Sequence, residues 1–134
     1  MKDNVKILIV DDQAGVRRLI AETLKEDNYE VHLAASGLEA LAAMQKMEPA
    51  IVLLDMKMPG MSGLEVIQEM KRLNLKSTIV LMTAYGELDM VNQAKKLGVV
   101  NFLPKPFDIN EMRMMVAGLM SAKEIESACL KIPG

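Results

Sequence analysis

Residues 5–12 read Val-Lys-Ile-Leu-Ile-Val-Asp-Asp, an apolar and largely β-branched run that ends on two carboxylates. Comparable apolar runs recur at residues 51–54, 78–82 and 99–103. Runs that are apolar on both faces are typical of strands inside a parallel sheet that helices cover on each side. A fifth run, residues 29–33, alternates between apolar and polar side chains and indicates an edge strand.

The segments between these runs follow the period of amphipathic helices. Apolar residues recur at helical spacing at Val16, Leu19, Ile20 and Leu24, at Val66, Ile67 and Met70, and at Met112, Met115, Val116 and Leu119. Turn-forming pairs at residues 27–28, 36–37 and 59–60 separate the units. The alternation of strand and helix predicts an α/β fold: a doubly wound, five-stranded parallel sheet with five helices and right-handed crossovers.

Length and composition fit a single folded domain. The chain has 134 residues, of which 51% are hydrophobic and 25% charged, so it can bury one ordinary core. We expect this domain to span residues 1–120, and residues 121–134 to form a C-terminal tail that extends the last helix. No DNA-binding module is expected after residue 120.

Charge and residue counts exclude other classes of protein. The formal net charge of −2 argues against a broad basic face for nucleic acid. The apolar runs are far shorter than the ~18–20 residues of a membrane helix, and the N-terminus shows no signal sequence, so a cytoplasmic protein is expected. A single cysteine, Cys129, and a single histidine, His32, exclude an internal disulfide and a Cys/His zinc site.

Polar residues stand where the predicted strands end. Asp11 and Asp12 follow the first run, and Asp55, Thr83 and Lys105 follow three others. The carboxyl ends of parallel strands share one edge of the sheet, where α/β proteins bind ligands. Three carboxylates there repel one another unless a cation holds them, and oxygen ligands favour Mg²⁺ over Zn²⁺. A cation, an ammonium and a hydroxyl around a carboxylate nucleophile are the groups that phosphoryl transfer requires.

Each of these residues alone has an ordinary structural explanation. Asp12 or Gln13 can cap the first helix, Thr83 can cap a later one, and Lys105 can be a solvated loop lysine. Their convergence on one edge of the sheet favours a functional site instead.

Four motifs contain these residues, in the same order along the chain. They are Ile9-Val10-Asp11-Asp12, Leu54-Asp55-Met56-Lys57-Met58-Pro59-Gly60-Met61-Ser62-Gly63, Met82-Thr83-Ala84-Tyr85 and Leu103-Pro104-Lys105-Pro106-Phe107. Together they resemble the receiver domain of two-component response regulators over residues 4–120, and most of all the single-domain receiver of the sporulation phosphorelay. The resemblance implies a flavodoxin-like sheet with strand order 2-1-3-4-5.

By this resemblance Asp55 is the phosphoacceptor, which takes a phosphoryl group from a phosphohistidine of a partner protein. Asp11, Asp12, Asp55 and the backbone carbonyl of Lys57 would hold Mg²⁺, with Mn²⁺ as an alternative. Such a chain is a signalling protein rather than an enzyme, although it assists its own phosphorylation and its slow dephosphorylation.

Other residues match the phosphoryl-binding and switch positions of the family. Thr83 would donate its hydroxyl to one phosphoryl oxygen, and Lys105 would pair with another. Thr83 and Phe102 correspond to the switch pair, in which the aromatic ring turns inward after phosphorylation. The Lys105–Pro106 peptide bond is expected to be cis, as in similar receivers.

Two residues are expected to set the lifetime of the phosphoryl group. Lys57 lies two residues after Asp55, and Tyr85 two after Thr83, beside the path of an attacking water. Long side chains there obstruct that water, so we expect slow self-dephosphorylation, which suits onward transfer. The plainer explanation of Lys57 is an exposed lysine that contributes only its carbonyl.

The resemblance implies a sensor histidine kinase or a histidine phosphotransferase as partner, and a phosphatase as a further one. Candidates for the docking surface are small and apolar residues near the acidic edge: Gln13, Ala14, Gly15, Val16, Leu19, Pro106 and Phe107. Some of them must belong to the core, because Val16, Leu19 and Ile20 cannot all point outward. We expect a monomer or a weak dimer, with no direct contact to nucleic acid or membrane.

Three alternatives remain open. The chain can be the isolated N-terminal receiver of a larger transcription-activating regulator, because residues 103–108 resemble those receivers too. An aspartyl-phosphate phosphatase would need a carboxylate where this chain has Lys57, which disfavours that class. A receiver-shaped scaffold that is never phosphorylated conflicts with the intact set of Asp11, Asp12, Asp55, Thr83 and Lys105.

Overall fold

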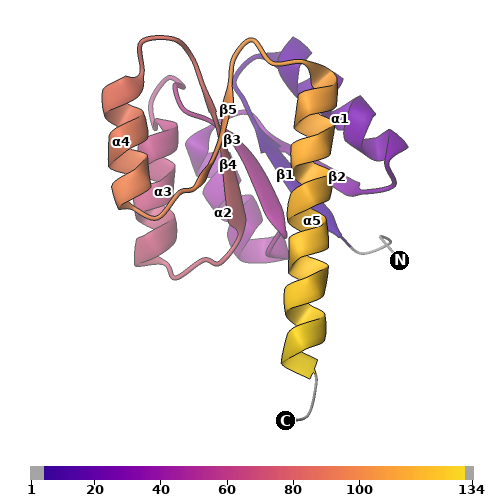
Figure 1. The fold of residues 1–134 in the computed structure, drawn as a ribbon. Helices are drawn as coiled ribbons and strands as arrows, with labels where there is room; N and C mark the ends of the chain where they lie inside the picture. Colours follow the sequence, from indigo (N-terminus) through magenta and orange to yellow (C-terminus); the bar gives the residue numbers. More distant parts are fainter. Residues whose placement is uncertain (1–4, 132–134) are drawn as a thin grey trace.

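The computed structural model describes residues 5–131, with side chains described up to residue 123. Within this range five strands alternate with five helices (Figure 1). The elements are β1 Lys6–Val10, α1 Ala14–Glu26, β2 Glu30–Ala34, α2 Gly37–Met47, β3 Ile51–Asp55, α3 Gly63–Arg72, β4 Thr78–Thr83, α4 Leu88–Lys96, β5 Asn101–Pro104 and α5 Ile109–Lys131. The alternation predicted from the hydrophobic pattern is confirmed.

The five strands form one parallel sheet in the order β2-β1-β3-β4-β5. This order confirms the predicted doubly wound, flavodoxin-like topology, with β2 at one edge. In the register, Asp55 lies beside Met82 and Thr83 lies beside Pro104. The strands β3, β4 and β5 therefore end at a common edge, and the polar residues at their ends are held close to one another.

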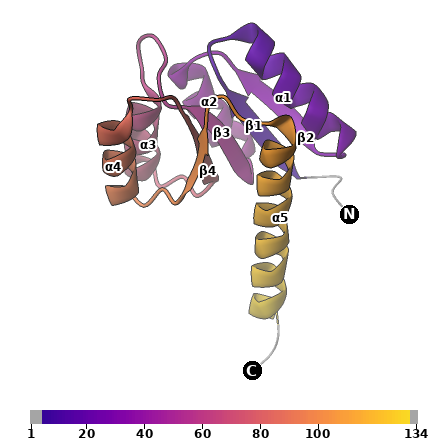
Figure 2. The same cartoon turned by 45° about the horizontal axis from the view of Figure 1, so that its top comes forward.

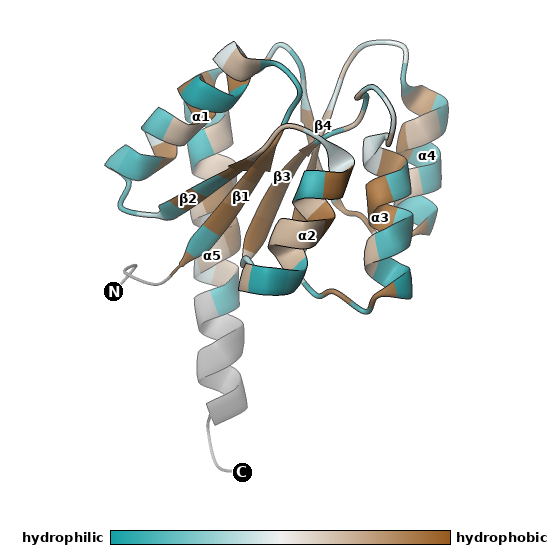
Figure 3. Cartoon of the chain, turned by 180° about the vertical axis from the view of Figure 1, so that it is seen from behind, coloured by the Kyte–Doolittle hydropathy of each residue, from teal (hydrophilic) through white to brown (hydrophobic). Residues whose placement is uncertain are grey.

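Helices cover both faces of the sheet and create two apolar layers (Figure 2). Successive residues of β1 alternate between them. Ile7 and Ile9 pack with α1 and α5 in the α1/α5 layer, whereas Leu8 and Val10 pack with α2, α3 and α4 in the α2–α4 layer. The central strands are mostly hydrophobic, β2 carries hydrophilic residues, and the helices around the sheet have hydrophilic outer faces (Figure 3). Burial on both faces explains the continuous apolar runs of the central strands.

The last strand begins later than the sequence pattern predicts. The apolar run starts at Val99, but β5 starts at Asn101. Gly98 has a positive φ of 100°, and the backbone N–H of Val99 donates to the carbonyl of Ala94 at 3.1 Å. Gly98 adopts the left-handed conformation that glycine favours at helix C-termini, and the next residue, Val99, forms the hydrogen bond that ends α4. Val99 therefore does not join the sheet.

α5 continues to Lys131 and extends well past the edge of the sheet (Figure 1). The final residues of the predicted tail, 132–134, lie outside the described residues, and the division of the chain at residue 120 stays a prediction. Across residues 5–131 we find no helix with the length and apolar character needed to cross a bilayer.

Candidate functional site

Three carboxylates meet at the carboxyl edge of the sheet. Asp11 and Asp12 follow β1, and Asp55 is the last residue of the adjacent strand β3. One carboxylate oxygen from each residue lies within 4.8 Å of the other two. Asp11 is fully buried and Asp55 is 7% exposed, whereas Asp12 is exposed. The structure thus brings together the three acidic residues that the sequence places at strand ends.

Lys105 adds a positive charge to this acidic group. It follows β5, where its backbone N–H donates to the carbonyl of Thr83 at 2.6 Å, and the Lys105–Pro106 bond is cis. Its Nζ lies 3.0 Å from Asp11 Oδ2 and 3.3 Å from Asp55 Oδ1. Burial alone would lower the pKa of Lys105, but hydrogen bonds to the two carboxylates and their negative charges raise this pKa above its ordinary value. Lys105 is therefore a cation at neutral pH.

One ammonium does not compensate for two buried carboxylates. Burial, reinforced by the negative charge of Asp11, raises the pKa of Asp55 to about 6. The charge of Lys105 and a backbone hydrogen bond from Lys57 act in the opposite direction. Holding these carboxylates away from water costs free energy, which a second cation at the site would offset. A donor set made only of oxygens suits a hard divalent cation.

Two further contacts fix the position of Asp11. Its Oδ1 accepts a hydrogen bond from the backbone N–H of Gln13 at 2.9 Å, and its main-chain oxygen accepts one from Arg17 Nη1 at 2.6 Å. Gln13 is the N-cap of α1, but its side chain forms no capping bond. The side chain of Gln13 therefore does not cap the helix, although Gln13 occupies the N-cap position, and Asp12 lies one residue before that position. Sequence reasoning missed Arg17, because its partner is a main-chain oxygen and the type of the residue alone does not indicate such a contact.

A glycine lets α3 begin directly against the end of β3. The backbone N–H of Gly63 donates to the carbonyl of Met56 at 2.8 Å. A Cβ on residue 63 would lie only 2.5 Å from the main-chain oxygen of Asp55, which a real side chain cannot do. Ser62 and Glu65 form a reciprocal capping box at this end of α3. The start of α3 therefore supports the strand end that carries Asp55.

Thr83 ends β4 and is 7% exposed. The loop that follows is closed by Glu87, a buried residue whose Oε1 accepts a hydrogen bond from the backbone N–H of Ala84 at 2.7 Å. Glu87, not Thr83, is the N-cap of α4. Sequence reasoning missed Glu87, because the sequence around a glutamate that precedes a helix does not indicate whether its side chain is buried or solvated.

The second predicted switch residue, Phe102, lies on β5, and the two predicted lifetime residues lie on loops at this edge. Phe102 lies beside Leu81 in the sheet and packs, partly buried, in the α2–α4 layer. The ammonium of Lys95 lies 5.7 Å from the centroid of its ring. Lys57 and Tyr85 are both exposed, on the loops after β3 and β4. The roles of these residues in switching and lifetime stay predictions.

An open apolar hollow lies beside the acidic residues on the α1 side. Its lining consists of Gln13, Val16, Leu19, Ile20, Lys105, Pro106 and Phe107. Leu19 is 56% exposed although periodicity places it on the buried stripe of α1, while Ile20 is fully buried. The remaining docking candidates, Ala14 and Gly15, are exposed in the first turn of α1. The hollow therefore gathers most of the predicted docking residues, and Lys105 connects it to the acidic site.

Comparisons with known proteins agree with this architecture. Residues 7–117 match the family described as response regulator receiver domain. The chain is 47% identical over 120 residues to sporulation initiation phosphotransferase F of Bacillus subtilis (strain 168), which covers 90% of this chain and 97% of that protein. It is 35% identical over 111 residues to the regulatory protein AtoC of Escherichia coli (strain K12), which covers 83% of this chain and 24% of that protein.

The fold is shared with solved structures of the same kind. The chemotaxis protein CheY4 of Vibrio cholerae superposes with a TM-score of 0.79 at 29% identity, over 86% of this chain and 98% of that chain. The sheet order, the acidic strand ends and the match over residues 7–117 lead to one assignment. The chain belongs to the response regulator receiver domain family of signalling proteins.

Proposed function

We propose that the chain accepts a phosphoryl group onto Asp55 from a phosphohistidine of a partner protein. An oxygen of the Asp55 carboxylate forms the new bond to phosphorus, the bond between phosphorus and the imidazole nitrogen breaks, and the imidazole leaves with the electron pair. The observation that carries this proposal is Lys105 Nζ, which lies 3.3 Å from Asp55 Oδ1 and 3.0 Å from Asp11 Oδ2. A nucleophile and a charge-stabilising group are thereby held side by side.

The same residues suit a divalent cation, for which we propose Mg²⁺, with Mn²⁺ as an alternative. Asp11, Asp12, Asp55 and the backbone carbonyl of Lys57 would hold it. When bound, the cation supplies positive charge that offsets the charges of the carboxylates and of the phosphoryl oxygens. The clustering of three carboxylates within 4.8 Å, two of them buried, supports this proposal.

Thr83 and Lys105 would each bind one oxygen of the phosphoryl group, Thr83 through its hydroxyl and Lys105 through its ammonium. In this proposal the Thr83 side chain moves toward the phosphoryl group when Asp55 is phosphorylated. Phe102, partly buried two residues before the end of β5, is the aromatic residue proposed to respond. Thr83 and Phe102 together form the proposed switch.

A relay role suits the chain better than direct control of transcription. Lys57 and Tyr85 are exposed on the two loops beside the acidic site, where their long side chains would slow hydrolysis and preserve the phosphoryl group for transfer. A relative with 47% identity is named a sporulation initiation phosphotransferase. The alternative, the receiver of a larger transcription-activating regulator, is less well supported, because the regulatory protein AtoC is 35% identical and the match covers only 24% of it.

The proposed partner is a sensor histidine kinase or a histidine phosphotransferase that docks on the hollow beside α1. Exposed Leu19 and partly buried Phe107 offer apolar contacts there, and the small Ala14 and Gly15 allow a helix to approach closely. A phosphatase is a further candidate partner.

We further propose that the protein lies in the cytoplasm and is a monomer or a weak dimer that is not an enzyme. In this proposal residues 1–120 form the receiver and residues 121–134 form a tail.

The experiment that tests this function is the intact mass of the protein after incubation with Mg²⁺ and acetyl phosphate. Asp55→Asn and a reaction with EDTA are the controls. We expect one added phosphoryl group that is absent from both. An adduct on Asp55→Asn would move the acceptor to another residue, and no adduct on folded wild-type protein would favour a scaffold that is never phosphorylated.

A further inference from the structure

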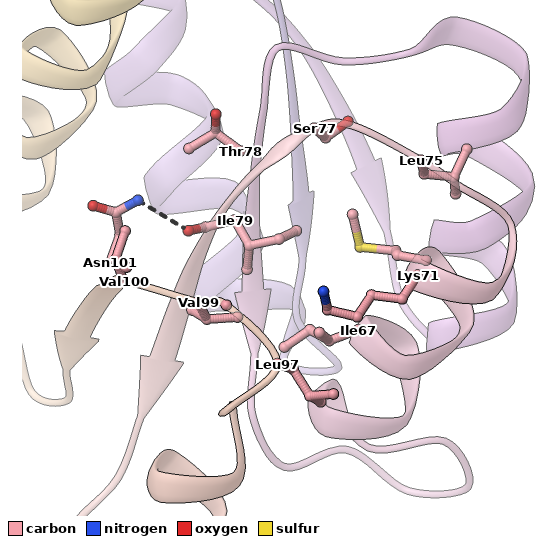
Figure 4. Close-up of a pocket in the computed structure, with 12 residues that line it drawn as sticks. Ile67, Lys71, Leu75, Ser77, Thr78, Ile79, Leu97, Val99, Val100 and Asn101 are labelled. Atoms are coloured by element: carbon pink, nitrogen blue, oxygen red, sulfur yellow. Dashed lines mark hydrogen bonds between the residues drawn. The ribbon is translucent and has the colours of Figure 1, made fainter. Parts of the chain in front are cut away.

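A pocket lies at the opposite edge of the sheet from Asp55, between the C-terminal ends of α3 and α4 (Figure 4). Its volume is about 310 Å³, at the lower end of the range for small-molecule sites. Apolar side chains form somewhat more than half of its walls and come from α3, β4, the segment between them and the segment between α4 and β5: Ile67, Met70, Leu75, Ile79, Leu97 and Val99. Polar residues, among them Ser77, Thr78 and Asn101, form the rest. The pocket is open to solvent on one side and large enough to receive the body of a small ligand.

Lys71 directs its ammonium into this pocket. It belongs to the last turn of α3, and its side chain extends across the pocket toward Leu97 (Figure 4). Its Nζ lies 3.8 Å from the place where a Cβ on Gly98 would stand, an ordinary contact distance, which places the ammonium beside the end of α4. Among the described residues, Lys71 forms neither an ion pair nor a side-chain hydrogen bond. The ammonium is therefore available to a ligand.

The surroundings of the pocket are positive although the whole chain has a net charge of −2. An adjoining hollow, which shares part of its lining with the pocket, contains Lys76 and Lys123 beside Glu48. Lysines in the last turns of helices also offset the negative end of the helix dipole. That effect explains why Lys71 stands near the end of α3, but it leaves the ammonium free to pair with an anion.

We propose that this pocket binds a small organic anion with an apolar body, in the manner of a short-chain carboxylate. The carboxylate would pair with Lys71, and the hydrocarbon would lie against Ile79 and Val99. An inorganic anion would not use the apolar walls, and a neutral ligand would leave the ammonium unpaired, so the pocket selects for both features. This site does not depend on the phosphoryl transfer proposed above.

A titration of the ¹⁵N-labelled full chain with hexanoate tests the proposal, with hexanamide as the neutral counterpart. We expect saturable shifts of the backbone amides of Leu75, Thr78 and Val99. The expected Kd is about 1 mM, which is ordinary for a ligand of this size. Hexanamide should bind about fivefold more weakly, because it lacks the charge that pairs with Lys71.

Lys71→Met removes the charge and keeps an apolar side chain of similar length, so hexanoate binding should weaken about fivefold. Lys71→Glu should abolish it. Lys46→Met, at an exposed lysine in the last turn of α2, is the matched control and should bind as the wild type does. Unchanged amide shifts far from the pocket will show that the variants are folded. Equal binding by Lys71→Met, shifts centred on Phe107, or no saturation would each overturn the proposal.

Discussion

A Cβ atom on residue 63 would lie 2.5 Å from the main-chain oxygen of Asp55. The first residue of α3 is therefore in direct contact with the strand end that carries the proposed phosphoacceptor, and only glycine leaves enough room. The orientation of Asp55 depends on this close packing of helix on strand.

Gly63→Ala is expected to lower the free energy of unfolding by about 1–3 kcal/mol, because the added methyl group forces the backbone apart. Gly118→Ala is the matched control, since Gly118 lies in α5 with nothing within 4 Å of its added Cβ. That substitution should stabilise the protein by about 0.5–1 kcal/mol. Urea unfolding of both variants measures the difference, and equal effects would contradict the packing described for Gly63.

Asp55 makes the stability of the metal-free protein depend on pH. Its pKa is about 6 in the folded protein against an ordinary value of 3.8, so the folded state binds this proton more tightly and loses stability as pH rises through that interval. Above it, the charged form costs on the order of 1–3 kcal/mol. Asp55→Asn should therefore be more stable than the wild type at about pH 7.5, with the gain vanishing near about pH 4.

Urea unfolding in EDTA across this pH range measures the effect of Asp55→Asn. Asp89→Asn, at an exposed carboxylate in the first turn of α4, is the control and should change stability by about 0.5 kcal/mol or less. If Asp55→Asn is no more stable than wild-type protein at about pH 7.5, the burial of a charged Asp55 is not destabilising.

Mg²⁺ should stabilise the folded protein if the three carboxylates hold it. At a free concentration ten times the Kd, the expected gain is about 1.4 kcal/mol. Asp12→Asn removes the exposed carboxylate of the group and should reduce the gain, while Asp89→Asn should keep it. Thermal unfolding at increasing Mg²⁺, and again after addition of EDTA, gives the measurement. If the melting temperature of the wild-type protein does not change with the Mg²⁺ concentration, the carboxylates do not form a cation site.

Arg17→Met should cost about 1.5–3 kcal/mol of stability, because it removes a charge-assisted hydrogen bond to the main-chain oxygen of Asp11. The neighbouring Arg18 is exposed, and Arg18→Met should stay within about 0.5 kcal/mol of the wild type. The comparison uses two arginines of one helix and the same substitution. Similar unfolding curves for the two variants would show that the contact of Arg17 contributes little.

The double variant Lys57→Asn, Tyr85→Glu should shorten the lifetime of the phosphorylated protein. Replacing two long side chains beside the acidic site opens the path of water, and a roughly tenfold faster decay corresponds to about 1.4 kcal/mol of activation free energy. Intact mass at intervals after removal of the phosphodonor gives the half-life. An unchanged half-life would leave Lys57 as an ordinary exposed lysine.

The convergence of the acidic residues could be predicted because it follows from topology. Asp11, Asp55 and Lys105 each follow or end a strand that the hydrophobic pattern predicts, and parallel strands bring such ends to one edge of a sheet. The hydrogen-bond partners around them could not be predicted in this way. The bond from Arg17 to a main-chain oxygen and the burial of Glu87 depend on loop conformation, for which residue type gives no signal.

Errors in the predicted element boundaries have a similar origin. Val99 has the character of a strand residue, but Gly98 ends α4 in a left-handed conformation and commits Val99 to a helix-terminating hydrogen bond. Leu19 fits the helical period of α1 and is nevertheless 56% exposed, because it lines the open hollow beside Lys105. The hydrophobic period of the sequence predicts which segments form helices and strands, whereas tertiary packing determines where each element ends and which of its residues are exposed.

The sheet stands between the proposed docking surface and the proposed switch residue. Val16, Ile20 and Phe107 belong to the α1/α5 layer, whereas Phe102 belongs to the α2–α4 layer. A partner that docks on α1, as proposed, would contact the α1/α5 layer, and α4 lies on the opposite face of the sheet. If a protein that recognises the phosphorylated form bound on α4, it and the phosphoryl donor would approach the receiver from opposite faces of the sheet. Exclusion between upstream and downstream partners would then have to arise from the size of those partners and not from the receiver itself.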